Sequence, residues 1–229
     1  MKHQWFLIGA GLLLGAAGCV ENDADLGTCP GNCTVVRGRL VTAGGTEALA
    51  GIPLTAQWVG GRYYVRQKAA ATTDGNGNFE LSFLLRDDEL AAGYFQLQYA
   101  VKADDYYQLD DSRISLPDLV RDTAVTIGNY LVPRKAFVEL AITNRQAIGP
   151  NDSYWSNFAS LYGSHTVIGP YGGGPAIGWA SELLDAAVPV PGDQPIVVNH
   201  VRNRNGIRTT SADTLYIPHG TRRRYTVTF

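Results

Sequence analysis

Hydrophobic side chains recur at every second position through much of this 229-residue chain, and this period constrains the fold more than any other feature. Phe95, Leu97, Tyr99 and Val101 form the clearest stripe, and residues 79–83 carry a similar one. Successive side chains of a strand point to opposite faces, so each stripe covers one face of a sheet. Apolar residues make up 45% of the chain, enough for a sizeable core, and the 26 glycines favour tight turns. We therefore expect an all-β fold with the stripes buried between stacked sheets.

Alternation in the first half is broken by turn residues. Gly60-Gly61 separates two alternating segments and predicts a hairpin, in which Val65 and Gln67 lie on the face opposite Arg66 and Lys68. The strands expected here are 36–40, 54–58, 63–68, 79–83, 95–101 and 122–132, with one helical turn at 86–92.

The second half, residues 134–229, begins with a strand at 137–142 and continues with a long irregular stretch from Asn144 to Gly178. Strands resume at 196–201, and Asn205-Gly206 is a typical hairpin turn. Shorter strands follow at 214–217 and 224–229. A second β-sandwich of about 95 residues is expected, a common size for a domain.

The N-terminus has the features of an export signal. A basic start and an apolar segment from Trp5 to Leu14 precede small residues and Cys19. This resembles a bacterial lipoprotein signal with the lipobox Ala16-Ala17-Gly18-Cys19, in which Ala16 replaces the usual Leu. The resemblance implies removal of residues 1–18, acylation of Cys19 with palmitate-type chains, and a lipid anchor in the membrane of the cell envelope. Val20 stands where an Asp would retain the protein at the inner membrane, which favours the outer membrane. An ordinary secretory signal is the alternative.

Residues 19–33 are polar and acidic and are expected to form a lipidated tether. Cys29 and Cys33 flank Pro30-Gly31-Asn32, and an oxidising envelope permits a disulfide between them. Two unpaired thiols are the alternative. Three intervening residues do not fit a thioredoxin-type redox motif, and no further metal ligands stand nearby.

Three short motifs carry a family resemblance. Residues 36–40 (Val-Arg-Gly-Arg-Leu), residues 49–54 (Leu-Ala-Gly-Ile-Pro-Leu) and the turn from Thr72 to Phe79 look like a carboxypeptidase regulatory-like domain. The resemblance implies a transthyretin-like, Ig-like β-sandwich over residues 34–132 without peptidase activity. Residues 134–229 resemble no family that we recognise. The chain is thus expected to be two tandem β-sandwiches after a signal and a tether.

The sequence offers no catalytic, metal or cofactor motif. His165, His200 and His219 have no metal-binding spacing, and the turn at Asp74 lacks the later residues of a calcium loop. A net charge of −2 argues against a nucleic-acid partner. The remaining charged clusters are expected to be solvated: 87–89, 104–105, 110–111 and the arginines 222–224. We predict that the protein is not an enzyme.

Aromatic residues between 154 and 179 are the one feature with a binding interpretation. Trp155, Tyr171 and Trp179 would stack on sugars or anchor a protein if exposed, whereas the alternative is that they fill the second core. The leading hypothesis is a noncatalytic, lipid-anchored interaction or scaffold protein of the cell envelope. The alternatives are a glycan-binding accessory lipoprotein that serves nutrient uptake, with a polysaccharide partner, and a surface-fibre or adhesin component.

Overall fold

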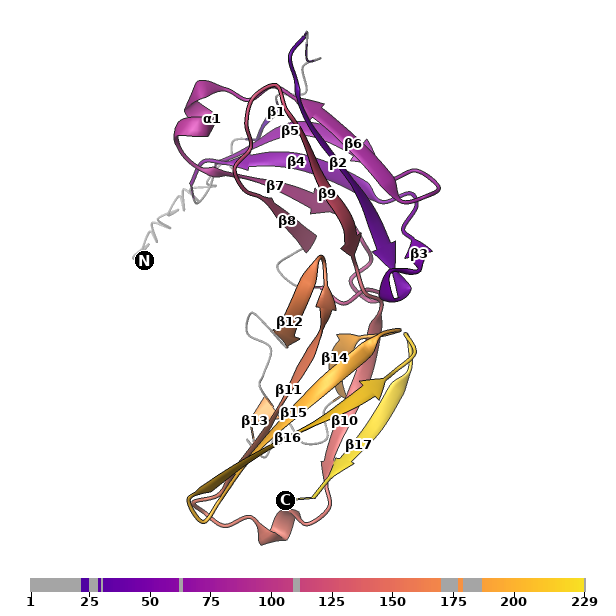
Figure 1. Cartoon of the computed structure of the whole chain (residues 1–229), viewed down its shortest axis with the longest axis vertical. Helices are drawn as coiled ribbons and strands as arrows, with labels where there is room; N and C mark the ends of the chain where they lie inside the picture. Colours follow the sequence, from indigo (N-terminus) through magenta and orange to yellow (C-terminus); the bar gives the residue numbers. More distant parts are fainter. Residues whose placement is uncertain are drawn as a thin grey trace, which may run out of the picture.

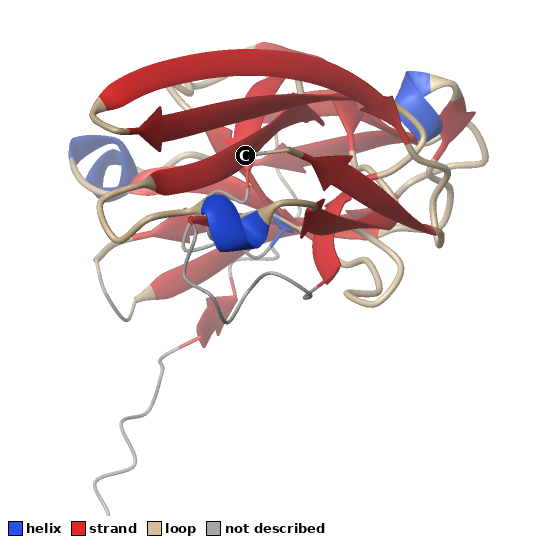
Figure 2. Ribbon diagram, turned by 90° about the horizontal axis from the view of Figure 1, so that it is seen from below, coloured by secondary structure: helices blue, strands red, loops and turns tan. Residues whose placement is uncertain are grey.

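The computed structural model describes residues 22–24, 29, 31–61, 64–108, 112–169, 177–178 and 187–228. Strands dominate, and the few helical segments are short (Figure 2). The chain forms two β-sandwiches that follow one another along its long axis (Figure 1), each with its own buried core. The expected all-β fold with two tandem sandwiches is confirmed. No described helix is long and apolar enough to cross a membrane.

The first sandwich packs two sheets face to face. One sheet has the order β5–β4–β7–β8, with the short β1 added in parallel beside β5. In the other sheet β2 lies between β6 and β9, and β3 pairs with its end. The stripes at 79–83 and 95–99 are buried between the sheets as expected. The elements are β1 Asn22–Ala24, β2 Thr34–Thr42, η1 Ala43–Gly45, β3 Glu47–Ala48, β4 Pro53–Val59, β5 Val65–Thr72, β6 Asn78–Phe83, α1 Asp87–Ala91, β7 Tyr94–Tyr99, β8 Arg113–Leu116 and β9 Ala124–Leu131.

The second sandwich has sheets of the order β14–β10–β17 and β12–β11–β15–β16, and β13 pairs with β11. Its core is formed by inward residues of both sheets, among them Val138, Phe158 and Val198. The predicted Asn205-Gly206 hairpin is confirmed between β15 and β16. The elements are β10 Lys135–Ile142, η3 Arg145–Ala147, β11 Ser153–Tyr162, β12 His165–Gly169, β13 Ile177–Gly178, β14 Ala187–Pro191, β15 Pro195–Arg204, β16 Ile207–Tyr216 and β17 Arg222–Val227.

The two sandwiches have the same strand topology. In each, the first strand pairs in parallel with the last (β2 with β9, β10 with β17) and antiparallel with a middle strand (β6, β14). The other sheet follows the same order in both, β5–β4–β7–β8 in the first and β12–β11–β15–β16 in the second. A parallel pairing of the two terminal strands is uncommon in consecutive antiparallel hairpins, so its repetition identifies the halves as two copies of one architecture.

The joint between the sandwiches is formed by the turn after β11. Leu131 and Gly163 exchange both backbone hydrogen bonds, with N···O distances of 3.0 and 2.8 Å. The preceding Tyr162, only 3% exposed, belongs to the core of the first sandwich although β11 belongs to the second. Its hydroxyl lies 2.6 Å from that of Tyr99, and its ring packs edge-on against Tyr107 and Tyr130. The second sandwich therefore closes the open end of the first.

The expected irregular stretch from Asn144 to Gly178 is wrong, because β11 and β12 lie within it. Alternate residues of β11 are buried, but two of the inward positions are Ser156 and Ser160. These polar residues interrupt the hydrophobic stripe that a half-buried strand normally shows. β16 is likewise longer than the predicted strand 214–217. Most of its side chains are exposed and polar, so its sequence lacks the alternation of apolar and polar residues that predicts a strand.

Candidate functional site

The outer edge of β16 is a long, exposed strand edge of the second sandwich. β16 pairs with β15 over ten consecutive residues without a bulge, and all side chains from Ile207 to Thr214 are exposed. The described part of the chain places no strand on its other side. An edge strand directs half of its N–H and C=O groups away from the sheet, where they can pair with another chain.

The turn geometry shows which residues of β16 face outward. Asn205 and Gly206 have φ of 51° and 77°, as in a two-residue type I′ turn, so the flanking residue Ile207 is hydrogen-bonded to β15. The bonding then alternates, which directs the backbone of Arg208, Thr210 and Ala212 outward. Consistent with this, the amide of Thr214 donates to the Oδ1 atom of Asp213 at 2.7 Å instead of to β15.

Several other sheet edges carry features that disfavour pairing with another chain. β1 covers the first three residues of β5, β8 has only four residues, and β9 is interrupted where its register with β2 shifts. β14 contains two prolines, and β17 begins with three arginines. Natural proteins blunt edges by these devices. β16 has no proline and no charge between Thr209 and Ala212, so it remains competent to pair.

The predicted stacking residues are only partly within the described chain. Trp155 on β11 is half-buried, and the guanidinium of Arg208 lies 5.4 Å from its ring centroid. One face of this ring is therefore occupied by the protein's own cation. Tyr171 and Trp179 lie outside the described residues, so their joint role with Trp155 stays a prediction.

A polar network connects the two sheets of the second sandwich near β16. The Nδ1 atom of His200 lies 2.6 Å from the hydroxyl of Tyr154 and 2.8 Å from that of Ser156, and its Nε2 atom lies 2.9 Å from the hydroxyl of Tyr225. Tyr225 donates to Asp213 at 3.0 Å, so it must accept from Nε2–H, which leaves Nδ1 as an acceptor.

The network is structural in character. Ser156 and Tyr154 are buried, so the Ser–His pair is closed to a substrate that a nucleophile would have to reach. Burial lowers the pKa of His200, which favours the neutral imidazole that the hydrogen bonds require. Burial, followed by the bond to Asp213, raises the pKa of Tyr225 to about 12. The network thus fixes β17 against the inner face of β15 and β16.

A buried charge cluster lies in the first sandwich, where the sequence predicted solvated charges. The carboxylate of Glu89 is fully buried and lies 2.8 Å from the Nζ atom of Lys68 and 2.8 Å from the Nη1 atom of Arg66. Trp58 lies beside Arg66, whose guanidinium is 5.1 Å from the ring centroid. The expected solvation of the 87–89 cluster is therefore wrong for Glu89, although Asp88 is exposed.

A β-bulge explains this burial. Ala56 pairs with Ala69 and the next residue, Gln57, pairs with Gln67, so Lys68 is an extra residue in β5. The extra residue shifts the alternation and turns Arg66 and Lys68 inward. The Gly60-Gly61 hairpin is confirmed, and of the two predicted faces of β5 the one with Arg66 and Lys68 is buried.

Other predicted charged groups have local roles. Asp74 accepts from the amides of Asn76 and Asn78 at 2.9 and 2.8 Å, which closes the turn and lowers the pKa of Asp74. Arg222 pairs with Glu139 at 2.9 Å, so the arginine run is not solely solvated. Among the described residues, no group of three or more His, Cys, Asp or Glu side chains is placed to hold a metal ion.

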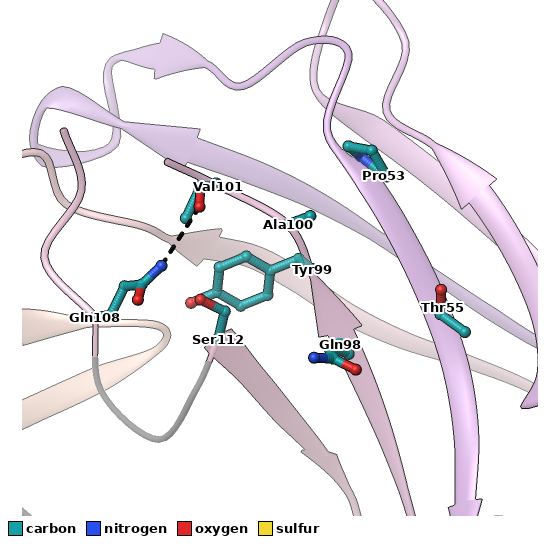
Figure 3. A pocket seen from close by; sticks show the side chains of 8 residues that line it. All are labelled: Pro53, Thr55, Gln98, Tyr99, Ala100, Val101, Gln108 and Ser112. Carbon is teal, nitrogen blue, oxygen red and sulfur yellow. Dashed lines mark hydrogen bonds between the residues drawn. The ribbon is translucent and has the colours of Figure 1, made fainter. Parts of the chain in front are cut away.

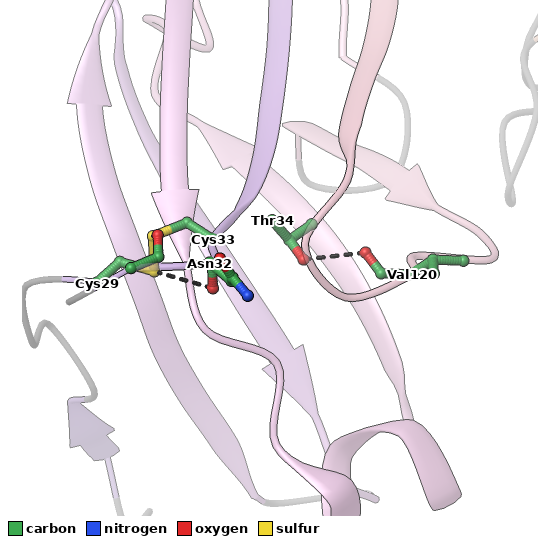
Figure 4. The surroundings of a disulfide bond; sticks show 6 residues. Cys29, Asn32, Cys33, Thr34 and Val120 are labelled. Atoms are coloured by element: carbon green, nitrogen blue, oxygen red, sulfur yellow. Dashed lines mark hydrogen bonds between the residues drawn. A yellow bond between two sulfur atoms is a disulfide. The ribbon is translucent and has the colours of Figure 1, made fainter.

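The tether carries a disulfide. Cys29 and Cys33 are joined, with their Cα atoms 5.9 Å apart (Figure 4). The next residue, Thr34, donates to the carbonyl of Val120 at 3.0 Å and fixes the start of β2. The tether is therefore tied to the first sandwich where its sheet begins. Cys19 lies outside the described residues.

A shallow hollow beside β7 is lined, among the described residues, by uncharged side chains (Figure 3). Thr55, Tyr99 and Ser112 supply hydroxyls, and Gln108 donates to the carbonyl of Val101 at 3.5 Å. Burial raises the pKa of Tyr99 well above its usual value, so this phenol is a poor acid.

Comparisons with known proteins do not assign a family. No family model matches the chain, and no curated protein matches its sequence. The shaft pilin of Lactobacillus rhamnosus GG is 8% identical with a TM-score of 0.28, over 86% of this chain and 97% of the pilin. A streptococcal ancillary pilin is 14% identical with a TM-score of 0.32, over 86% and 63%. A 9R-lipoxygenase from Cyanothece is 15% identical with a TM-score of 0.32, and the match spans 45% of this chain and 17% of the enzyme.

Proposed function

We propose that the chain is a noncatalytic interaction protein of the bacterial cell envelope that pairs with an extended segment of a partner along the outer edge of β16. The observation that carries this proposal is the unbroken ten-residue edge, uncharged at its centre. Pairing along a sheet edge takes its affinity from main-chain hydrogen bonds and its specificity from alternate side chains. A surface-fibre or adhesin component would use the same edge.

The architecture supports presentation of this edge at a distance from the anchor. β2, which follows the tether, starts near one end of the long axis, and the turn between β15 and β16 lies near the other (Figure 1). The joint around Tyr162 fixes the two sandwiches to each other. A lipid at Cys19 would thus hold the first sandwich at the membrane and project β16 away from it.

If a partner pairs along the outer edge of β16, we expect the contact to depend on the outward N–H group of Ala212. With a photo-reactive benzophenone amino acid at position 210, irradiation of intact cells should give one dominant crosslinked product. Ala212→Pro removes an outward N–H without disturbing the bonds to β15, and should abolish that product. Ala212→Val keeps the amide and should retain it. Crosslinking that survives Ala212→Pro in a folded protein would refute pairing along this edge.

A lipid anchor at Cys19 predicts that the protein leaves the membrane when this residue is replaced. Cys19→Ala should move the protein from the membrane fraction to the soluble fraction and abolish incorporation of a palmitate analogue, because a thioether-linked lipid needs this thiol. Fractionation and labelling of cells measure both effects. Unchanged membrane retention would show that Cys19 is not the anchor.

A further inference from the structure

A cleft of about 410 Å³ lies at the joint, lined by residues of both sandwiches. Glu47 comes from the first sandwich and Arg134 from the connection, whereas Leu161, Tyr216 and His219 come from the second. Clefts at domain interfaces are frequent sites of small-molecule binding.

The walls of the cleft are fixed in place. The amide of Gly192 donates to the carbonyl of Arg134 at 2.7 Å, and the buried side chain of Gln194 bonds to both backbone groups of Leu161 at 3.0 and 3.1 Å. A Cβ atom on Gly44 would come within 2.9 Å of the carbonyl of Asp193, so the two sandwiches approach closely here. A pre-formed cleft binds a ligand without the cost of ordering its walls.

Two residues of the lining have unfavourable backbone conformations. Ala43 and Asp193 have φ of 48° and 60°, a region that residues other than glycine rarely adopt. Such backbone strain is found most often at functional sites. In this conformation the carboxylate of Asp193 accepts hydrogen bonds from the backbone amide and the Nδ1 atom of His219, at 2.9 and 2.7 Å.

The chemistry of the lining is amphipathic, and its carboxylates are already engaged. Glu47 pairs with Arg134 at 2.6 Å, and Asp193 accepts a hydrogen bond from His219, so each carboxylate has a partner within the cleft. Tyr216 is 56% exposed and Leu161 is 48% exposed, and they provide an apolar wall beside these polar groups. Paired charges favour a neutral ligand with many hydroxyls over a phosphate or a free carboxylate.

We infer that this cleft binds a neutral saccharide. An apolar sugar face stacks on the ring of Tyr216, while ring hydroxyls bond to the remaining lone pairs and N–H groups of Glu47, Arg134 and Asp193. The site is separate from the outer edge of β16 at Arg208–Ala212, and it differs from the predicted stacking cluster at Trp155.

Saturation-transfer NMR with maltotriose, cellotriose, xylotriose, mannotriose and chitotriose tests the inference on the full processed chain. At least one trisaccharide should receive saturation, and Tyr216→Ala should weaken its binding on the order of tenfold. Tyr94→Ala is the matched control, because Tyr94 is 53% exposed and lies in the first sandwich, outside the cleft lining.

Asp193→Asn gives a second test that keeps the shape of the side chain, and should also weaken binding. Circular dichroism would establish that both cleft variants are folded. Absence of transfer to all five trisaccharides, or equal binding by the wild type and Tyr216→Ala, would overturn the inference.

Discussion

Replacing Glu89 with glutamine is expected to lower the free energy of unfolding of the first sandwich by about 3–5 kcal/mol, the usual effect of removing one partner from a buried ion pair. Glu89 is the carboxylate shared by Lys68 and Arg66, and both cations are buried. Glutamine keeps the shape and an oxygen that can still accept from the amide of Arg86, which Glu89 does at 2.9 Å. The substitution therefore removes the charge and little else. Urea unfolding followed by tryptophan fluorescence measures the effect.

Asp88 provides the control for this prediction, because it is adjacent to Glu89 but its side chain is 59% exposed. Its 3.4 Å contact with Arg66 is open to water, so Asp88→Asn should change the free energy of unfolding by no more than about 0.5 kcal/mol. If Glu89→Gln were as stable as Asp88→Asn, the buried cluster would not stabilise the attachment of α1 to β5.

Tyr162→Ala is expected to cost about 3–5 kcal/mol and to uncouple the two sandwiches, because it empties a large aromatic position. The ring packs against Tyr107 and Tyr130 in the core of the first sandwich, and among the described residues of the second sandwich Tyr162 is the one that belongs to this core. NMR relaxation should give one rotational correlation time for both sandwiches in the wild type. Tyr162→Ala should give two different and shorter correlation times, one for each sandwich.

Tyr162→Phe separates the ring from the hydroxyl. It keeps the ring and removes the 2.6 Å bond to Tyr99, whose hydroxyl also bonds to Ser112, so the loss should be about 0.5–1.5 kcal/mol with the sandwiches still coupled. A single correlation time in Tyr162→Ala would show that the other contacts at the joint, among them the backbone pairing of Leu131 and Gly163, are enough to hold the two sandwiches together.

The sequence predicts those parts of the fold whose inward residues are apolar. The stripes at 79–83 and 95–99 lie in strands with buried faces, and both hairpins at glycine-containing turns form as expected. β11 escapes prediction because Ser156 and Ser160 occupy core-facing positions. The shared topology of the two sandwiches cannot be predicted from the sequence pattern either, because the order of strands in a sheet depends on long-range pairing, which local periodicity does not indicate.

The candidate sites are less predictable because they depend on residues that the structure brings together. A one-residue bulge at Lys68 buries charges that ordinary alternation would expose. The cleft combines Glu47 with Tyr216, which are far apart in sequence and meet only at the joint. The polar composition of β16 suits an exposed edge, yet only the strand pairing shows that no described strand covers this edge.

Residue-resolved amide hydrogen exchange along β16 tests the central claim most directly. In the isolated protein we expect Thr209 and Ser211 to be protected by β15, whereas Thr210 and Ala212 exchange rapidly because their N–H groups face water. Slow exchange at all four amides would mean that the outer edge is already covered, and the proposed partner surface would not exist.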